Sequence, residues 1–419
     1  MPAPLLGTDA RRLCLAAFLR ALATGLTGIH LGLFLGHLRL APVQAGLVVA
    51  AGLLGAASAS LLATLRGDRV GRRRFLVGLS VLGALGAAAA AFAGDVLSLG
   101  VFAFLGMLNG MGRDRGAALV LEQAALPATV ADDRRTAVLA AYNVAQDAGH
   151  ALGSLLAVLP ALAMRAGLSE PAALRSGFGL VALLSLAPLP LYLRLSPSAD
   201  APRVSGRPAL SPESRRRLAR LSGLFAVDSL AGGFLTAAFL TLFFRERFGA
   251  GPEALAPLFF AARVLNALSH AGAALLARRF GLVNAMVFTH APSSLLLVSV
   301  AFAPSFPVAA VLFLLREGLV EMDVPTRQSY VLAVVRPEER TFASGLTHLV
   351  RLAGWAVAPA AAGLLAQAGS VLAPLLAGAG MKLGYDALLY AACRNAPPPE
   401  EAATRPPARR SGARPPGGR

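Results

Sequence analysis

The sequence is poor in charged residues and nearly lacks cysteine. Only 15% of its 419 residues are charged and 56% are hydrophobic, whereas soluble domains carry about a quarter charged residues. The mean hydropathy is +0.63. So much apolar surface would not fit in the interior of a water-soluble globule, and the composition therefore predicts a protein that spans a membrane several times.

Several chemical signatures are also missing. Cys14 and Cys393 lie near opposite ends inside apolar runs, so neither a disulfide framework nor a cysteine metal site is indicated. The histidines fall in different apolar runs, and we expect no metal site. There is no glycine-rich phosphate loop with a lysine and no nucleophile-elbow pattern. We therefore expect neither an enzyme nor a bound cofactor.

The formal net charge is +17, and the sequence contains a single lysine, Lys382, so the positive charge is almost all arginine. The arginines cluster between long apolar runs, which is the pattern of positive loops kept on the cytoplasmic side of a membrane. Nucleic-acid binding, which needs basic patches with stacking aromatic residues, is not expected.

Runs of about 20 apolar residues predict helices that cross the bilayer, since backbone groups in lipid must be satisfied within the segment. Twelve such runs occur, six on each side of a polar segment at 195–217. They lie near 13–36, 42–65, 75–93, 96–120, 136–162, 174–194, 218–244, 253–277, 283–303, 306–330, 342–366 and 371–393.

This pattern predicts an all-α membrane protein of two six-helix bundles. The expected units are an N-terminal bundle (1–194), a cytoplasmic linker (195–217), a C-terminal bundle (218–393) and a disordered basic tail (394–419). Arginines dominate alternate loops, which places both termini in the cytoplasm. Short external loops and the lack of a signal peptide fit a bacterial plasma membrane.

The two halves share a faint repeat. Gln123, Arg135-Thr136, Asn143 and Ala148-Gly149 align without gaps to Gln328, Arg340-Thr341, His348 and Ala353-Gly354. Internal similarity between two sets of six spans predicts bundles related by a pseudo-twofold axis, with a site between them.

The sharpest motif follows the second run. Gly71 permits a tight turn there, and the arginines can contact anionic lipid headgroups. The segment resembles the signature loop of the major facilitator superfamily, although Thr64 replaces the opening glycine of that pattern. The residues that fit are Asp68, Arg69, Gly71, Arg72 and Arg73.

The resemblance covers nearly the whole chain. It implies a monomeric secondary transporter that moves a small molecule by alternating access, with the Asp68–Arg73 loop as a gate. Two weaker elements, 109–112 and 149–154, only partly match further signatures of the superfamily, and the second remotely resembles an antiporter motif. Both depart from those signatures, so they leave the direction of transport open.

Ionisable residues inside the runs should face a partner or a water-filled cavity, because a charge at the bilayer centre is costly. Asn143, Asp147 and His150 are spaced four and three apart, so they share one helix face. A histidine paired with a carboxylate is a plausible proton carrier near neutral pH. The alternative is a polar seam that seals the two bundles.

The second half supplies three more candidates for proton coupling or substrate binding. Asp228 occupies a position related to Arg20 in the first run, and the two could form an ion pair near the pseudo-symmetry axis. Because Arg20 is close to the helix start, snorkelling to the membrane surface is an equally good account of it. Glu317 and Glu321 share one helix face. Pro325 should then kink the tenth helix and free carbonyl groups.

Two pairs of charges four residues apart predict structural ion pairs. The first is Asp323 with Arg327, and the second is Lys382 with Asp386. In both cases the simplest interpretation is mutual neutralisation within one helix.

The leading hypothesis is therefore a proton-coupled transporter of a small molecule, with efflux by antiport slightly favoured. Uptake by symport and uniport are the alternatives within the same fold. A membrane-embedded enzyme or a sensor is the alternative of another class. The substrate cannot be identified from the sequence.

Overall fold

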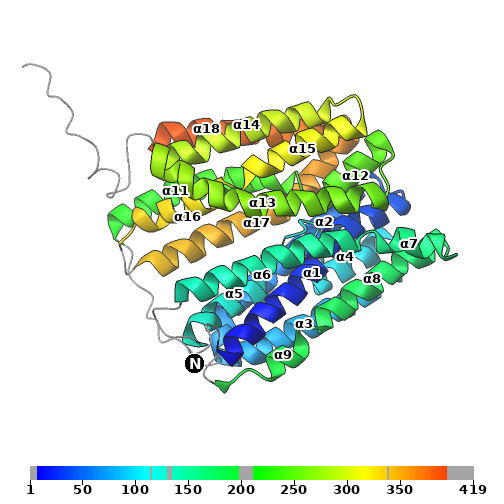
Figure 1. Ribbon diagram of the computed structural model, residues 1–419, viewed down its shortest axis with the longest axis horizontal. Coiled ribbons are helices and arrows are strands. Elements are labelled where there is room, and N and C mark those ends of the chain that lie inside the picture. The colour runs from blue at the N-terminus through cyan, green and yellow to red at the C-terminus, as the bar shows by residue number, and fades with distance from the viewer. Residues whose placement is uncertain (1–6, 114–115, 130–134, 198–210, 337–338, 394–419) are drawn as a thin grey trace, which may run out of the picture.

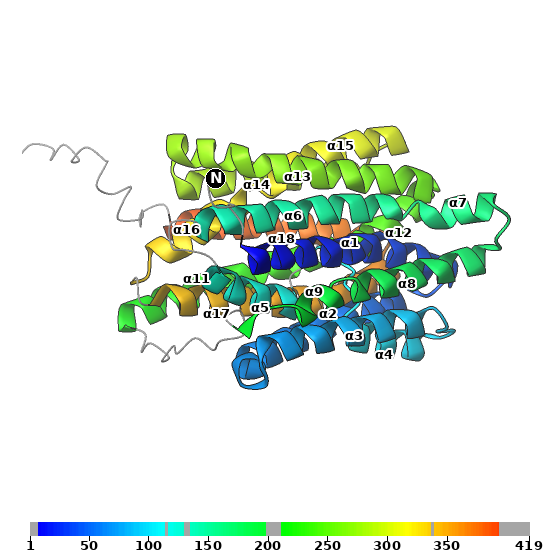
Figure 2. The same cartoon turned by 60° about the horizontal axis from the view of Figure 1, so that its bottom comes forward.

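The computed structural model describes residues 7–113, 116–129, 135–197, 211–336 and 339–393. In this part of the chain every regular element is a helix. The helices run along one common direction, as Figures 1 and 2 show from two sides, and form two bundles, one from each half of the sequence (Figure 1). The predicted all-α fold of two bundles is confirmed.

Six rods build the N-terminal bundle, and three of them consist of two consecutive helices. The elements are α1 (Thr8–His37), α2 (Pro42–Val70), α3 (Arg72–Ala90), α4 (Val96–Gly106) with α5 (Ala117–Ala125), the short η1 (Leu126–Thr129), α6 (Arg135–Leu156) with α7 (Leu159–Arg165), and α8 (Glu170–Leu186) with α9 (Leu189–Leu193).

The C-terminal bundle repeats this plan with six rods. They are α11 (Pro212–Gly233) with α12 (Ala237–Phe248), α13 (Pro252–Phe280), α14 (Leu282–Ala301), α15 (Phe306–Val320) with α16 (Asp323–Ala333), α17 (Arg340–Ala368) and α18 (Ala373–Cys393). α11 begins at Pro212, so the C-terminal boundary of the predicted linker 195–217 lies too far along the chain. The predicted tail 394–419 lies outside the described residues.

Three of the predicted spans are broken near their middle, and only the break in the tenth, near Pro325, was expected from the sequence. The fourth is interrupted between α4 and α5, where Met107 and Gly112 have positive φ angles of 52° and 68°. The tenth breaks at Glu321, four residues before Pro325. A proline has no N–H to donate to the carbonyl four residues earlier, so the break falls where that hydrogen bond would have formed. The seventh breaks between Gly233 and Ala237.

The predicted repeat has a structural counterpart. α6 begins at Arg135 and α17 begins at Arg340, the same aligned pair that the sequence offers. α6 packs against α1 in one half, and α17 packs against α11 in the other. Gly153 of α6 lies so close to Leu22 of α1 that a Cβ atom on it would sit 2.2 Å from the Leu22 carbonyl oxygen.

The two ends of the molecule differ in charge. We call the basic end the one that holds the first turns of α1, α3 and α11, where Arg11, Arg12, Arg72–Arg74 and Arg215–Arg217 lie. The described chain begins and finishes at this end, as Figure 1 shows for the N-terminus. We call the opposite end, with Arg39, Glu170, Arg245 and Glu253, the far end.

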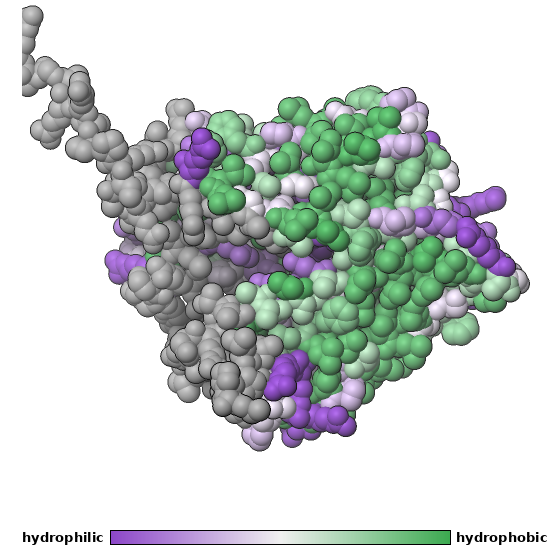
Figure 3. Space-filling view, in the orientation of Figure 1, coloured by the Kyte–Doolittle hydropathy of each residue, from purple (hydrophilic) through white to green (hydrophobic). Residues whose placement is uncertain are grey.

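Large apolar side chains cover the outer surface of the bundles, as Figure 3 shows for one face. Among them Phe92, Leu97, Leu183 and Phe288 are 79%, 77%, 67% and 67% exposed. Soluble proteins rarely expose contiguous apolar surface of this extent. Eight of the described rods are also long and apolar enough to cross a membrane, and this surface is the one that lipid would cover.

Contacts between the halves gather toward the far end. α2 packs on α17, and α12 packs on α1. A Cβ atom on Gly46 would lie 2.4 Å from the Pro359 carbonyl oxygen, so the helices touch through their backbones. Two ion pairs, which we call the far-end pairs, also join the halves there: Arg165 with Glu253 at 3.2 Å and Arg245 with Glu170 at 3.6 Å.

A backbone hydrogen bond joins the halves at mid-depth. The amide N–H of Ala238, in the first turn of α12, donates to the carbonyl oxygen of Gly110 over 3.0 Å. Cβ atoms on Gly28 and Gly32 would lie 2.5 Å from the Gly112 Cα and 2.6 Å from the Ala238 carbonyl oxygen. The breaks in the fourth and seventh spans therefore meet directly, which two unbroken helices could not do.

Glu339 links two helix starts at the basic end. Its carboxylate accepts the N–H of Ser211 at 2.6 Å, the hydroxyl of Ser214 at 2.5 Å and the N–H of Arg336 at 3.2 Å. These hydrogen bonds lower the pKa of Glu339 from its usual 4.5 to about 2, because they stabilise the ionised form.

We predict that Glu339→Gln lowers the thermal unfolding midpoint at pH 7. The pKa of Glu339 is depressed in the folded protein, so its stabilisation is complete above pH 4.5 and declines as the pH falls toward 2. The difference between wild type and variant should therefore narrow below pH 4.5, as measured by thermal unfolding in detergent across a pH series. A difference independent of pH would contradict the assignment.

Candidate functional site

A cavity lies between the two halves at mid-depth, with about 750 Å³ of atom-free space, part of it open to solvent. Figure 3 shows hydrophilic residues in the hollow between the bundles. Its walls come from the α4–α5 connection, α11, α12, α13, α14, α15, α16, α17 and α18. The residues that the argument uses are Arg113, Asp228, Leu240, Phe259, Arg263, His290, Phe313, Arg316, Glu317, Glu321, Asp323, Arg327, Arg351, Trp355 and Lys382.

Asp228 of α11 is the centre of one charge cluster. Its carboxylate lies 3.1 Å from Nζ of Lys382, 3.4 Å from Arg351 and 3.5 Å from Arg327. Asp228 is 3% exposed. A buried carboxylate that is shared by three cations stabilises their placement, because each charge would be costly without a partner.

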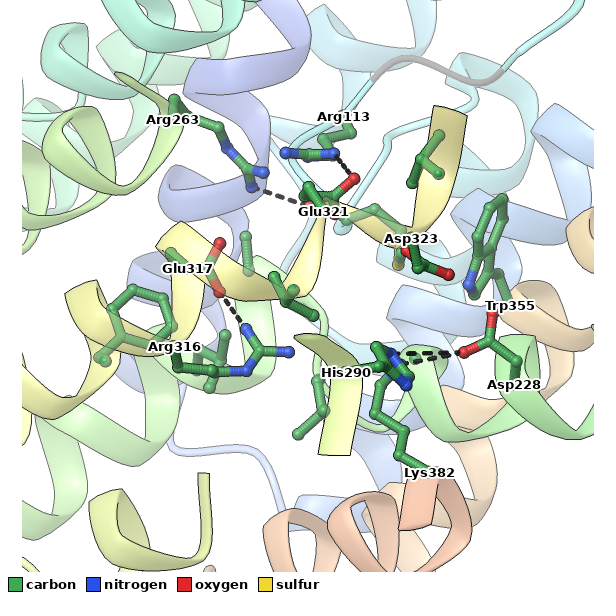
Figure 4. A pocket seen from close by; sticks show the side chains of 18 of the residues that line it. Arg113, Asp228, Arg263, His290, Arg316, Glu317, Glu321, Asp323, Trp355 and Lys382 are labelled. Carbon is green, nitrogen blue, oxygen red and sulfur yellow. Dashed lines mark hydrogen bonds and ion pairs between the residues drawn. The ribbon is translucent and has the colours of Figure 1, made fainter. Parts of the chain in front are cut away.

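His290 of α14 extends this cluster to a second carboxylate. Its Nδ1 lies 2.8 Å from Oδ1 of Asp386, and its Nε2 lies 3.1 Å from Nζ of Lys382. Figure 4 shows His290 and Lys382 beside Asp228. An ammonium group has only donors, so a charged Lys382 donates to Nε2. The proton of a neutral His290 ring then resides on Nδ1 and is donated to Asp386. Asp386, His290, Lys382 and Asp228 thus form one continuous chain, which we call the α14–α18 chain.

The break in the tenth span gives two further carboxylates different partners. Glu317 of α15 pairs with Arg316 and accepts a hydrogen bond of 2.7 Å from the Asn266 amide. Asp323, the first residue of α16, pairs with Arg327, in the contact that their spacing predicts. Arg327 also faces the Phe225 ring at 5.6 Å.

Residues from both halves meet at Glu321. Nη1 of Arg113, from the α4–α5 connection, lies 2.6 Å from Oε2 of Glu321, at the end of α15. Arg263 of α13 approaches the same region, and its Nη2 donates a long hydrogen bond of 3.5 Å to the Met111 carbonyl oxygen. Figure 4 shows Arg113, Glu321 and Arg263 grouped on one side of the cavity.

Several buried nitrogen atoms of these side chains lack a hydrogen-bond acceptor in the described structure. Two arginines of the cluster around Asp228 and two on the opposite wall each leave one such atom. They are Nη2 of Arg327, Nε of Arg351, Nε of Arg263 and Nε of Arg316. Buried donors are normally satisfied by protein, water or ligand, so the cavity presents a surplus of donors.

The N-terminal bundle encloses its own carboxylate. Glu122 of α5 is fully buried, pairs with Arg20 of α1 and accepts hydroxyl hydrogen bonds from Tyr142 at 2.6 Å and Tyr192 at 2.5 Å. The predicted ion pair between Arg20 and Asp228 is therefore wrong. Each residue has found a partner inside its own half.

The predicted pair of Lys382 with Asp386 is also wrong. Although both lie on α18, Lys382 contacts Asp228 and Asp386 contacts His290. These partners on α11 and α14 are close because the three helices pack together. Short sequence spacing had suggested neutralisation within one helix, whereas tertiary packing supplies the nearer partner.

The predicted proton-carrying face of α6 does not line the cavity. Asn143 is exposed, Asp147 is partly buried and His150 is 6% exposed. Asp147 lies near enough to Arg113 and Arg263 to influence both electrostatically. α6 packs against α13, so this face lies along the seam between the halves.

The predicted gating loop is shorter than the motif suggested. α2 continues to Val70 and α3 begins at Arg72, so Gly71 alone connects them, with a φ angle of 94° that favours glycine. Arg72 is buried and donates to the Ala124 carbonyl oxygen at 3.3 Å, while Arg69 and Arg73 are exposed. The side chain of Asp68 lies outside the described part.

Sequence reasoning missed most of the cations that line the cavity. Arg113, Arg263, Arg316 and Arg351 were not among the predicted site residues. A usable signal was the coincidence of an arginine with a break in its helix, as at Arg113 after the glycines of the fourth span. The single tryptophan, Trp355, gave no such signal, and it packs against the guanidinium of Arg351 at 4.7 Å.

Comparison with known proteins gives a consistent result. A sequence profile described as "Major Facilitator Superfamily" matches residues 13–359. An uncharacterised membrane protein of Saccharomyces cerevisiae, YJR124C, is 26% identical over 397 residues, which cover 86% of this chain and 88% of that protein.

Solved structures of transporters share the fold. The D-xylose–proton symporter superimposes with a TM-score of 0.72 at 14% identity, covering 91% of this chain and 97% of that one. The nucleoside transporter NupG superimposes with a TM-score of 0.68 at 16% identity, covering 92% and 98%. At these identities the likeness concerns the fold.

We predict that Asp228→Asn destabilises the protein by about 3–5 kcal/mol, because it leaves three buried cations without their shared carboxylate. The midpoint of thermal unfolding in detergent measures the loss. Glu213→Gln is the matched control, since its pair with Arg217 is exposed and such pairs contribute about 0–1 kcal/mol. Adding Lys382→Met to Asp228→Asn should restore part of the stability. Equal effects of Asp228→Asn and Glu213→Gln would contradict the prediction.

Proposed function

This chain belongs to the Major Facilitator Superfamily, and from that premise we propose that it is a proton-coupled secondary transporter working by alternating access. Membrane transport of a small molecule follows from the family and its structural relatives. The observation that supports proton coupling is the α14–α18 chain beside the central cavity, in which titratable groups are joined by distances of 2.8–3.1 Å.

In the proposed orientation the protein lies in the plasma membrane. Its basic end faces the cytoplasm, and both termini lie on that side. Positively charged segments are retained on the cytoplasmic face, and the arginines of the basic end form such segments. Because the halves touch at the far end, this arrangement corresponds to a cavity open toward the cytoplasm. We propose a monomer as the working unit, since each chain holds a complete cavity.

The proposed coupling step follows from donor and acceptor counting. His290 now accepts from Lys382 and donates to Asp386. A second proton on His290 would set an imidazolium 3.1 Å from an ammonium, so Lys382 would have to withdraw. The bond from Lys382 to Asp228 would be lost with it, leaving Arg327 and Arg351 as the partners of Asp228. Protonation thereby rearranges the charges that line the substrate cavity.

The proposed conformational cycle requires the far-end pairs to break. Arg165–Glu253 and Arg245–Glu170 are partly exposed, so each contributes little to stability and can open at low cost. Asp68 with its neighbouring arginines would then hold the basic end closed. Anionic lipid headgroups are the expected contacts of the exposed arginines.

The direction of transport depends on whether the substrate moves against the proton flow, with it, or without it. We retain a slight preference for efflux by antiport, based on the remote resemblance at 149–154. Uptake by symport is supported by the fold it shares with the D-xylose–proton symporter. Uniport remains the third mode. Asp147 is the alternative proton carrier, since it lies near Arg113 and Arg263 at the seam.

We predict that His290→Gln abolishes the acceleration of transport by an imposed pH gradient while preserving exchange at equal pH. Glutamine can bridge Lys382 and Asp386 by hydrogen bonds but cannot carry a proton. A ligand is first found by thermal stabilisation of purified protein against small-molecule libraries at two pH values. Its radiolabelled form is then followed in proteoliposomes, with and without a pH gradient of either sign.

Asp147→Asn is the matched comparison in the same assay. It should keep its pH-driven transport if the α14–α18 chain carries the proton. Loss of coupling in Asp147→Asn, with coupling retained in His290→Gln, would instead assign the proton to α6. Wild-type transport that ignores the pH gradient would refute proton coupling altogether and favour uniport.

A further inference from the structure

We infer that the cavity binds an organic anion, a carboxylate or similar acidic group carried on an apolar body, through Arg263, Arg316 and Arg351. This inference names the substrate class of the proposed transporter and so rests on that proposed function. It follows from the charge balance of the walls, from one cation without a carboxylate partner, and from the unsatisfied donors.

The walls of the cavity carry more positive than negative charge. Six cations line it: Arg113, Arg263, Arg316, Arg327, Arg351 and Lys382. Four carboxylates line it: Asp228, Glu317, Glu321 and Asp323. With His290 neutral, the lining residues carry an excess of two positive charges; Asp386, hydrogen-bonded to His290, and Asp147, near Arg263, lie outside this lining. A site away from bulk water is most stable when such an excess is balanced, and a ligand with a negative charge balances it.

Arg263 contributes most directly to this excess. In the described part of the chain no carboxylate oxygen forms an ion pair with it, and its Nη2 reaches only the Met111 carbonyl oxygen at 3.5 Å. Arg113 repels it, while Glu317, Glu321 and Asp147 attract it without forming an ion pair in the described structure. The guanidinium of Arg263 is therefore available to bind a negative group that enters the cavity.

The donors without acceptors lie on two walls of the same cavity. Nε of Arg263 and Nε of Arg316 belong to α13 and α15, and Nε of Arg351 belongs to α17. Guanidinium groups present planar N–H pairs that match the two oxygens of a carboxylate. α12 also begins at the wall with Ala237, so the positive end of its dipole adds to the field.

Apolar side chains also line the cavity, and they are the reason for the apolar body of the proposed ligand. Phe259, Phe313 and Leu240 line it together with Trp355. Most of this surface lies on the C-terminal half, next to the arginines. Small inorganic anions would leave it uncovered, whereas an apolar body attached to the acidic group would cover it.

Trp355 offers a direct test, because it is the only tryptophan in the chain and lines the cavity. Purified protein is titrated with cyclohexanecarboxylate, and the change in tryptophan fluorescence is recorded. Cyclohexanecarboxamide and cyclohexylmethylammonium have nearly the same shape but are neutral and positive. We expect a saturable change with the carboxylate alone, and inorganic phosphate should give none at equal concentration.

Variants connect the signal to the arginines. Arg263→Gln should weaken carboxylate binding at least about tenfold, because it removes a charge-assisted hydrogen bond. Arg263→Lys should weaken it less, since the charge is retained. Arg216→Gln, an exposed arginine at the basic end, is the control and should bind like wild type. Thermal unfolding midpoints check that each variant is folded.

Two outcomes would overturn the inference. The first is a fluorescence response to the amide or the ammonium probe that equals the response to the carboxylate. The second is the absence of any saturable carboxylate response in a wild-type protein whose unfolding midpoint is normal.

Failure of the proposed function gives a different pattern. If the protein binds the carboxylate but shows no pH-driven flux, the proposed anion site stands and only the proposed proton coupling is refuted. If a pH gradient drives flux of a neutral ligand and no carboxylate binds, the proposed transport function stands and the proposed anion site is refuted.

Discussion

A charged side chain held inside a membrane must meet an opposite charge or water, and this constraint organises the interior of the protein. Glu122 is closed off by Arg20 and two tyrosines, so its charge is fully matched within one bundle. Asp228 is shared by three cations at the edge of the cavity. The matched cluster joins helices within one bundle, whereas the cluster around Asp228 lies at the cavity, where the proposed substrate and proton would act.

Hydropathy and arginine placement were enough to predict twelve rods in two halves, and the aligned pair Arg135 and Arg340 marked the starts of equivalent helices. Of the two ion pairs predicted from spacing within one helix, one formed and one did not. Asp323 does pair with Arg327, but Lys382 prefers Asp228, 154 residues away. That choice depends on how α11 and α18 are rotated against each other, which the spacing of residues along one helix does not encode.

The two bundles divide the work despite their common plan. The N-terminal bundle contributes few charged groups to the cavity, chiefly Arg113 at the break of the fourth span. The C-terminal bundle supplies the carboxylates, the α14–α18 chain and most of the arginines. Sequence similarity between the halves therefore reports their shared architecture, while the chemistry is concentrated in one of them. The breaks in the fourth and seventh spans were missed because these segments are uniformly apolar, whereas Pro325 predicted the break in the tenth.

The hydrogen bond between Ala238 and Gly110 has a mechanical consequence. It ties the bundles at mid-depth through main-chain atoms, beside the close approaches at Gly28 and Gly32. In the proposed alternating-access cycle this tie near the middle is a fulcrum: tilting one bundle would separate the far ends and bring the basic ends together, while the atoms at the fulcrum would move least. Evolution can thus replace the side chains around the cavity to suit a new cargo without disturbing the pivot, provided that these glycines are kept.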